Sequence, residues 1–205
     1  MNVSVLLAHP APGSFNHAIA DTVVSTLREM GHSVRFHDLY AERFDPLTTA
    51  GELARDAALP PLVDQHCREM DGAEGLVIVH PNWWSAPPAI LRGWVDRVLR
   101  AGRAYRFVPD GQGGARCEGL LPVRVGVVFN TSNTPQEKEM QLYGDPLETH
   151  WIKVVFGLCG VRHTYRRNFS SVILSTLEER VGWLEEVRET VRQQEARLRE
   201  TRVAH

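Results

Sequence analysis

Cysteine is scarce in this sequence: Cys67, Cys117 and Cys159 are its three cysteines, and no two of them form a CxxC pair. An odd number of cysteines without that spacing argues against a disulfide framework and against a zinc site. A reducing compartment is the usual place for such a chain, so a cytoplasmic location is predicted.

Long hydrophobic runs are missing as well. No window approaches about 18 uncharged apolar residues, so no transmembrane helix is expected. The chain enters a strand-like run at once, without a basic region ahead of a long apolar stretch, and no signal peptide is predicted. A formal net charge of −2 gives no electrostatic reason to bind nucleic acid or an anionic membrane, and neither partner is expected.

The remaining composition is that of an ordinary globular chain. Hydrophobic residues make up 43% and charged residues 23% of 205 residues, which suits one well-buried core. No break in composition and no internal repeat divides the sequence. A single domain over residues 1–205 is therefore predicted, with residues 176–200 as a C-terminal amphipathic helix.

Strand and helix patterns alternate along the chain. Strands are predicted over residues 3–8, 33–37, 75–80, 123–129 and 161–168. Helices are predicted over residues 14–30, 49–58, 61–70, 87–101, 145–158 and 176–199. The glycine-rich residues 108–121 fit either a mobile loop or a hairpin. Five strands with intervening helices predict an α/β fold, in which a mostly parallel sheet is covered on both faces.

Ligands of such sheets bind beyond the carboxyl ends of the strands, which singles out the loops at residues 9–16, 81–86 and 130–134. In the first loop, Ser14 precedes a helix whose free N–H groups and dipole could hold a phosphate, with His9 as a further donor. The alternative is that Ser14 is only an N-cap and His9 a loop residue. The loop contains neither GxGxxG nor a Walker motif.

The second loop, PNWWSAPP, places Trp83 and Trp84 at a strand's end, where an indole could flank one face of a flat ligand. The alternative is that both tryptophans fill the core or an oligomer interface. The third loop, NTSNTP, could bind the polar edge of a heterocycle or form an ordinary turn. We interpret His80 as a buried structural histidine. No metal site is predicted, because His150 and His163 lack ligand-type neighbours at a suitable spacing.

These loops belong to a longer pattern that resembles the flavodoxin-like NAD(P)H:quinone oxidoreductases, a family that includes DT-diaphorase and the ancillary subunits of glutathione-gated potassium efflux systems. The central motif is carried by Pro81, Trp84, residues 88–91, Gly93, Trp94 and residues 96–98. The phosphate loop is matched by His9, Ser14, Phe15 and Asn16. Gly144, Asp145, Trp151, Cys159 and Gly160 match a later helix. The resemblance covers residues 3–169.

The resemblance implies a flavodoxin-like, doubly wound parallel sheet of five strands in the order 2-1-3-4-5. It also implies bound FAD or FMN, with FAD favoured, NAD(P)H as co-substrate, and a homodimer with active sites at the subunit interface. Flavin phosphate would be bound by Ser14, Phe15 and Asn16 with His9 beside them. The isoalloxazine would be lined by Pro81, Asn82, Trp83 and Trp84, and its other edge by Thr131, Ser132 and Asn133. Tyr105 and Phe107 would wall the substrate pocket from across the dimer.

The sequence departs from the family at three places that concern chemistry. Ser132 and Asn133 stand where DT-diaphorase-like members carry a glycine pair. Tyr143 replaces a histidine that is proposed to stabilise charge, and residues 137–139 offer no counterpart of its companion tyrosine. A charge-relay pair is therefore not expected, although Tyr143 could donate a hydrogen bond to an anionic flavin and is the one catalytic candidate.

The function implied is an enzyme that passes a hydride from NAD(P)H through bound flavin to a quinone or a similar flat acceptor. An alternative is a flavin-binding regulatory subunit that docks on a membrane transporter, with redox activity secondary. A flavodoxin-type one-electron carrier is disfavoured, because such carriers are usually more acidic than this chain.

Overall fold

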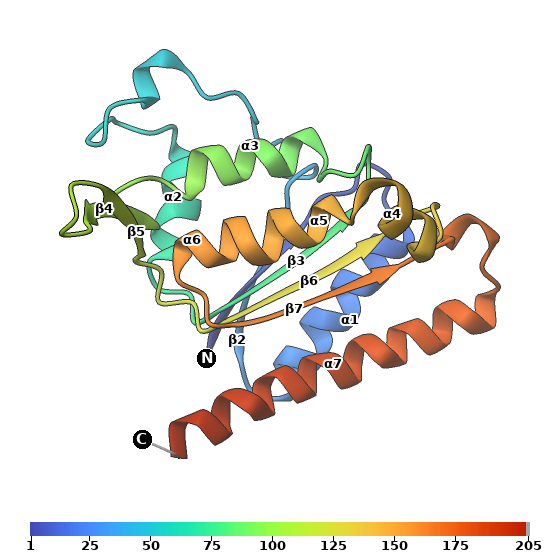
Figure 1. Ribbon diagram of the computed structural model, residues 1–205. Coiled ribbons are helices and arrows are strands. Elements are labelled where there is room, and N and C mark those ends of the chain that lie inside the picture. Colours follow the sequence, from blue (N-terminus) through green and yellow to red (C-terminus); the bar gives the residue numbers. More distant parts are fainter. Residues whose placement is uncertain (204–205) are drawn as a thin grey trace.

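A five-stranded parallel sheet forms the centre of the computed structural model, which describes the backbone of residues 1–203 and the side chains of residues 1–196 (Figure 1). Its strands are β1 (Asn2–Leu7), β2 (Ser33–Asp38), β3 (Gly75–Pro81), β6 (Val125–Thr131) and β7 (His163–Phe169). They lie in the order β2-β1-β3-β6-β7, and every neighbouring pair is parallel. The two strands β4 (Tyr105–Pro109) and β5 (Ala115–Gly119) belong to a separate sheet, so β6 and β7 are the fourth and fifth strands of this one, and the predicted order 2-1-3-4-5 is confirmed. Residues 204 and 205, which the single-domain interpretation includes, lie outside the described residues.

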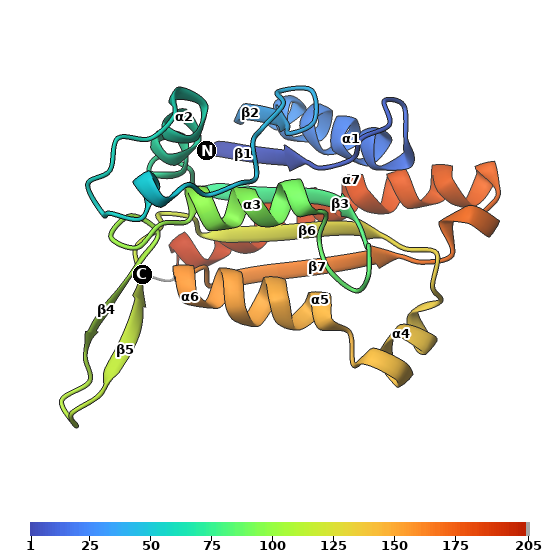
Figure 2. The same cartoon turned by 90° about the horizontal axis from the view of Figure 1, so that it is seen from above.

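Helices cover both faces of this sheet (Figures 1 and 2). One face is covered by α1 (Phe15–Glu29) and α7 (Leu177–Val203). The other is covered by α2 (Pro61–Met70), α3 (Ala89–Val98) and a helical stretch made of α5 (Pro146–Glu148), η2 (Thr149–Phe156) and α6 (Gly157–Cys159). Alternation along β1 supplies both cores, because Leu6 packs on the second face while Val5 and Leu7 pack on the first.

Helix α1 begins and ends where the sequence predicts. Ser14 is its N-cap, with a side-chain oxygen that accepts the N–H of His17 at 3.4 Å. Gly31 follows the helix with a φ of +80°, a left-handed conformation that glycine adopts without strain. The long helix α7 packs on α1 through the buried Val187 and Val191. Among the described residues, no helix combines the length and the apolar character needed to cross a membrane.

The predicted helix over residues 49–58 is wrong in extent, because only η1 (Ala50–Glu52) forms there. The guanidinium of Arg97, on α3, donates to both oxygens of Glu52 at 2.9 and 2.8 Å. Arg100 donates to the carbonyl oxygens of Glu52 and Ala54. These carbonyls are the acceptors that a continuing helix would use, so contacts with α3 and with Arg100 just beyond it hold the segment open.

The glycine-rich segment forms an antiparallel hairpin of β4 (Tyr105–Pro109) and β5 (Ala115–Gly119), which projects from the body of the protein (Figure 2). Of the two predicted alternatives, the hairpin is confirmed. Its base lies against the chain at Cys159 and Gly160, where a Cβ on Gly119 would overlap main-chain atoms. Glycine at position 119 therefore allows the close approach of the hairpin to α6.

Candidate functional site

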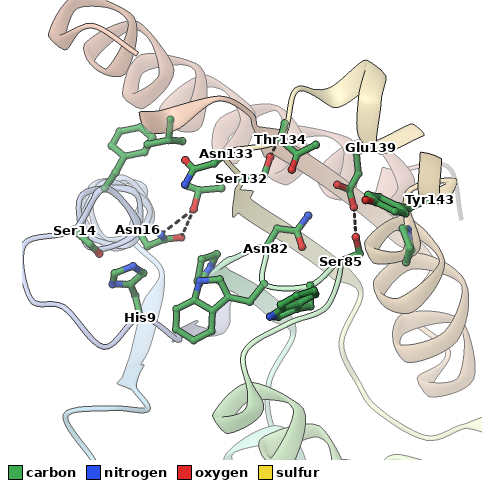
Figure 3. A pocket seen from close by; sticks show the side chains of 17 residues that line it. His9, Ser14, Asn16, Asn82, Ser85, Ser132, Asn133, Thr134, Glu139 and Tyr143 are labelled. Atoms are coloured by element: carbon green, nitrogen blue, oxygen red, sulfur yellow. Dashed lines mark hydrogen bonds between the residues drawn. The ribbon is translucent and has the colours of Figure 1, made fainter. Parts of the chain in front are cut away.

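A cavity of about 840 Å³ lies beyond the carboxyl ends of β1, β3 and β6 (Figure 3). The three loops that the sequence singled out all line it. The residues brought together there include every predicted flavin-binding residue and the catalytic candidate: His9, Ser14, Phe15, Asn16, Pro81, Asn82, Trp83, Trp84, Thr131, Ser132, Asn133 and Tyr143. Its position at the point where strand order reverses, between β1 and β3, is the usual ligand position of a doubly wound sheet.

The first loop turns donors toward the cavity at the start of α1. The N–H of Ala11 donates to Nδ1 of His9 at 3.1 Å, which leaves the ring proton of a neutral His9 on Nε2. Partial burial lowers the pKa of His9, so this neutral form is favoured. Asn16 is buried, and its Nδ2 donates to Oγ1 of Thr131 at 3.0 Å, which joins the first loop to the third.

The second loop is a tight turn with an unusual backbone. Trp84 and Ser85 have φ values of +56° and +54°, a left-handed conformation that is uncommon for residues other than glycine. Hydrogen bonds between the main chains of Trp83 and Ala86 close the turn, at 3.0 and 3.1 Å. Trp84 is fully exposed and Trp83 is 42% exposed, so the alternative in which these tryptophans fill the core is wrong.

Asn82 offers an acceptor that has no hydrogen-bond partner among the described residues. Its Oδ1 is buried, and its side chain lines the cavity next to the tryptophan turn. A buried polar atom without a partner is uncommon in folded proteins and calls for a ligand or a water molecule. An N–H group of a heterocyclic ligand would satisfy it.

The third loop has a structural role as well as a place in the cavity wall. Oγ of Ser132 donates to the carbonyl oxygen of Thr134 at 2.8 Å, and Oδ1 of Asn133 accepts the N–H of Ile173 at 3.1 Å. These bonds fix the loop, as the ordinary-turn alternative proposed. Thr131 belongs to the end of β6, because the strand runs two residues further than predicted.

Helix α4 (Gln136–Tyr143) was missed by the sequence analysis, and it brings Glu139 to the cavity together with the predicted Tyr143. Tyr143 and Glu139 lie one turn apart on its cavity face. Oγ of Ser85 donates to Oε1 of Glu139 at 2.6 Å, so the helix holds the tryptophan turn from the far side (Figure 3). The spacing of four between Glu139 and Tyr143 was the available signal, but this segment has too little apolar periodicity to predict a helix.

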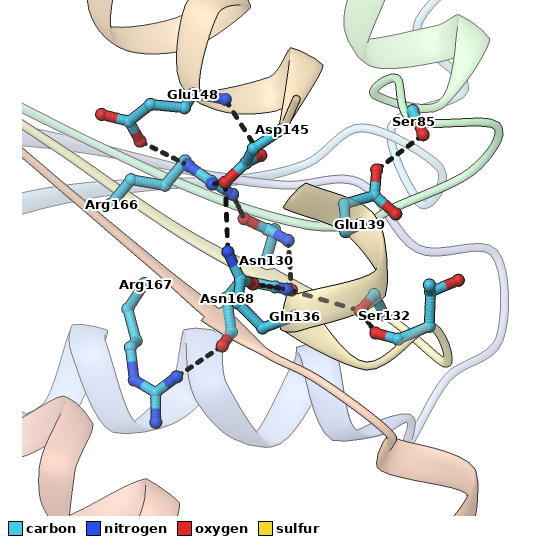
Figure 4. A network of polar contacts seen from close by, with 11 residues as sticks. Ser85, Asn130, Ser132, Gln136, Glu139, Asp145, Glu148, Arg166, Arg167 and Asn168 are labelled. Carbon is cyan, nitrogen blue, oxygen red and sulfur yellow. Dashed lines mark hydrogen bonds and ion pairs between the residues drawn. The ribbon is translucent and has the colours of Figure 1, made fainter. Parts of the chain in front are cut away.

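A buried polar network supports both ends of α4 (Figure 4). Arg166, on β7, pairs with Asp145 directly after the helix, and also donates to Glu148 at 2.9 Å and to Oδ1 of Asn130 at 2.7 Å. Asn130 in turn donates to Oδ1 of Asn168 at 2.7 Å. The network therefore ties the helix that carries Tyr143 to the two strands beneath it.

Tyr105 and Phe107 do not join this site within one chain. They lie on β4, in the hairpin, with their ring centroids 5.8 Å apart, and neither lines the cavity. Phe107 is 67% exposed. Their predicted place at the substrate pocket would need a second copy of the chain.

His80 has the structural role that the sequence predicted. It is fully buried; Nε1–H of Trp151 donates to its Nε2 and its Nδ1–H donates to the carbonyl oxygen of Pro81, both at 2.8 Å. Burial lowers the pKa of His80 to about 3, so the ring stays neutral. Both ring nitrogens are occupied, and His80 has no atom left for catalysis.

A second cluster of polar side chains lies at the carboxyl end of β2. Ligand-type atoms of His37, Glu42 and His66 come within 4.8 Å of one another, as in a metal site. However, Nε1–H of Trp94 donates to Nδ1 of His66 at 2.9 Å, so a neutral His66 carries its proton on Nε2, which faces Glu42 at 3.2 Å. A metal would need a lone pair on that nitrogen. The arrangement therefore suits protons held between the histidines and the carboxylate, and it does not suit a metal ion.

The protons of this cluster should make stability depend on pH. His37 lies between Glu42 at 2.8 Å and Glu69 at 2.6 Å. Burial opposes its charge, but the two carboxylates outweigh burial and raise the pKa of His37. Burial likewise acts to raise the pKa of Glu42, but the hydrogen bond with His37 and the close contact with His66 outweigh it and hold that pKa at about 2.

The contribution of Glu42 is complete above its unfolded pKa and is lost as the pH falls toward the folded value. That of His37 is complete below its unfolded pKa and is lost as the pH rises through the raised value. H37Q should therefore lower the free energy of unfolding more at about pH 5.5 than at about pH 8.5. Urea denaturation at both pH values measures this, and equal losses would contradict it.

Comparison with known proteins gives three findings. The model of a family described by its flavodoxin-like fold matches residues 1–179. An NAD(P)H oxidoreductase of Haemophilus influenzae, named as uncharacterized, is 31% identical over 189 residues, which span 90% of this chain and 91% of that protein. The mammalian quinone dehydrogenases among the curated relatives are matched over half of this chain, and the match spans only about half of their own length, 44% to 53%.

Two solved structures add a comparison in three dimensions. The Smu.1420 protein of Streptococcus mutans superposes with a TM-score of 0.82 at 30% identity, over 94% of this chain and 100% of that chain. The NAD(P)H:quinone oxidoreductase of Methanothermobacter marburgensis superposes with a TM-score of 0.77 at 25% identity, over 95% of this chain and 97% of that chain. Both similarities extend over nearly the whole chain.

Proposed function

This chain belongs to the family of proteins with a flavodoxin-like fold, and on that premise we propose that it passes a hydride from NAD(P)H through bound flavin to a quinone or a similar flat acceptor. Its relatives make it an oxidoreductase: the Haemophilus influenzae protein is named for NAD(P)H, and the Methanothermobacter marburgensis enzyme for NAD(P)H and quinone. The same relatives give no support to the alternative of a transporter subunit.

The observation that carries the proposal is the convergence of the three loops on one cavity with a flat indole wall and an unpartnered acceptor. Ser14, Asn16 and the first N–H groups of α1 suit an anionic phosphate. Oδ1 of Asn82 suits an N–H on the edge of a flavin ring. The exposed face of Trp84 suits the ring itself. The residues present therefore fit a flavin nucleotide.

A bound flavin would supply the capacity to accept and release a hydride, and the protein would orient the reacting rings and exclude water. Trp83 and Trp84 would keep water from one side of the reacting rings. The hydroxyl of Tyr143 would donate a hydrogen bond where negative charge develops, in place of the family's histidine. The turn that carries Trp84 is held by the bond between Ser85 and Glu139, so these two residues position the aromatic wall.

We also propose a homodimer, in which Tyr105 and Phe107 of one subunit wall the cavity of the other. Their exposure on a projecting hairpin supports this arrangement, since Phe107 is otherwise a large apolar side chain left in water. Sedimentation of the purified protein, compared with F107E, tests the dimer. A monomer in both would contradict it.

Steady-state oxidation of NADH and NADPH with a water-soluble quinone tests the function. We expect flavin-dependent oxidation of at least one of the two nucleotides, and the reaction should require flavin when the protein is first stripped of it. No flavin-dependent oxidation of either nucleotide would overturn the proposal. Mass analysis of the released cofactor identifies it as FAD or FMN.

Replacing Trp84 with alanine should weaken flavin binding about tenfold to a hundredfold, because stacking of a flat ring on an aromatic side chain contributes about 1–3 kcal/mol. The fold should be unaffected, since Trp84 is fully exposed and makes no core contact. W84F keeps an aromatic face and is the matched control. Equilibrium dialysis measures the affinities, and an unchanged affinity in W84A would remove Trp84 from the site.

A further inference from the structure

We propose that His17 and Asp38 control the hydroxyl proton of Ser14, so that the cavity takes up one proton when it binds a phosphate-bearing ligand. The inference rests on the proposed function, in which the first loop holds the flavin phosphate, and it adds a regulation of that site by pH. His17 would act through Ser14 as a positioning residue, because it does not itself line the cavity.

A hydroxyl, an imidazole and a carboxylate form a continuous chain behind the cavity wall. Oγ of Ser14 lies 2.8 Å from Nδ1 of His17, and Nε2 of His17 lies 3.3 Å from Oδ2 of Asp38. The other oxygen of Asp38 accepts the N–H groups of Tyr40 and Ala41 at 3.0 and 3.1 Å. The carboxylate is thus fixed at the end of β2, and only one of its oxygens faces His17.

The carboxylate decides where the protons of this chain lie. A carboxylate only accepts, so the contact with Asp38 places a proton on Nε2 of His17. In neutral His17, Nδ1 then has a lone pair and accepts the hydroxyl proton of Ser14. The backbone N–H of His17 also points at Oγ of Ser14. With its proton directed at His17, Ser14 has only lone pairs to present to the cavity, which repel an anion.

Binding a phosphate reverses this arrangement. Ser14 must turn its proton toward the phosphate, which would leave two lone pairs facing each other between Oγ and Nδ1. A proton on Nδ1 of His17 resolves the conflict, because the imidazolium then donates to Oγ while Oγ–H donates to the phosphate. Asp38 stabilises the new positive charge. Phosphate binding and protonation of His17 are therefore linked, and each favours the other equally.

The surroundings direct the proton to His17. Among the described residues, Asp38 faces it from the end of β2 and His9 from the loop after β1, with ring centroids 6.2 Å apart for the two histidines. His9 disfavours charge, because burial lowers its pKa and no carboxylate among the described residues lies as close to it as Asp38 lies to His17. Asp21 lies one turn along α1 with an exposed side chain.

Calorimetric titration with FMN and with FAD tests the linkage. Measurement in buffers of different ionisation enthalpy, at one pH, gives the number of protons taken up per ligand. For whichever nucleotide binds, we expect the wild-type protein to take up as much as one proton more than H17Q, in which glutamine cannot be protonated. As the pH rises, the nucleotide affinity of the wild-type protein should fall more steeply than that of H17Q, by as much as a further tenfold per pH unit. The ligand's own titration is common to both proteins and cancels.

Three further measurements make the test specific. Riboflavin, which lacks phosphate, should show no difference in proton uptake between wild type and H17Q. D38N should also lose the proton uptake, because its amide would donate to Nε2 and move the neutral ring proton to Nδ1, where it serves Ser14 without a charge. D21N removes a carboxylate from the same helix without altering the contacts among Ser14, His17 and Asp38. Its proton uptake should match that of the wild type.

The outcomes separate this inference from the proposed function. If FMN or FAD binds but wild type, H17Q and D38N take up the same number of protons, the linkage is wrong and the flavin site stands. If neither nucleotide binds the wild-type protein between about pH 5 and 8, where histidine changes charge, the flavin site itself is overturned. Should H17Q fail to fold, D38N against D21N gives the same comparison.

Discussion

Replacing Arg166 with methionine is expected to lower the free energy of unfolding by about 3–5 kcal/mol. The side chains of Arg166 and Asp145 are 4% and 8% exposed, so the substitution leaves a buried carboxylate without its partner. It also removes donors from Asn130 and Glu148. Because this network anchors the residues after α4, flavin affinity should fall together with stability.

The neighbouring Arg167 is the matched control for this prediction. It pairs with Glu186, but both side chains are more than one-third exposed, so R167M should cost only about 1 kcal/mol. Adding D145N to R166M should recover part of the loss, since a neutral amide replaces the unpaired charge. Urea denaturation of the four proteins measures these effects. Equal losses in R166M and R167M would show that burial of the pair does not matter.

Replacing Gly119 with alanine is expected to lower the free energy of unfolding by about 3 kcal/mol, the upper end of what overpacking costs, or to displace the hairpin. A methyl group at this position would overlap main-chain atoms of Cys159 and Gly160, which have no side-chain torsion through which to yield. Displacement would also move Tyr105 and Phe107, so the proposed dimer should be weaker and turnover should be slower.

Gly182 provides the contrasting substitution. It lies on the exposed side of α7, where an added Cβ meets no atom within 4 Å. G182A should therefore stabilise the protein by as much as about 1 kcal/mol through helix propensity. Thermal unfolding compares the two variants. A G119A protein as stable as the wild type would mean that the hairpin does not rest on α6 in solution.

Much of the fold follows from local pattern, and the reason can be read from particular elements. β3 and β6 are buried on both faces and therefore appear as uninterrupted apolar runs, and α1 has apolar residues at helical spacing between Ser14 and Gly31. The cavity followed from topology, since the carboxyl ends of parallel strands must meet. The flavin assignment came from the resemblance, which supplied the roles of residues such as Asn82.

What the sequence could not supply depends on contacts between distant residues. α4 has little apolar periodicity and is held by Asn168 and Arg166, more than 20 residues away, so its cavity residue Glu139 was missed. The short η1 is decided by Arg97, 45 residues away. His17 lies inside a predicted helix, and its proposed role depends on the contact with Asp38, at the end of β2. No local pattern contains such pairs.

The exposed tryptophan turn also equips the protein with an optical reporter. Of the five tryptophans, Trp94 and Trp151 are buried, whereas the indole of Trp84 lies wholly in water at the mouth of the cavity. Indole emission moves to shorter wavelength when water leaves the ring, and a neighbouring flavin absorbs that emission. The emission of Trp84 should therefore change when the cavity is occupied, without any added label.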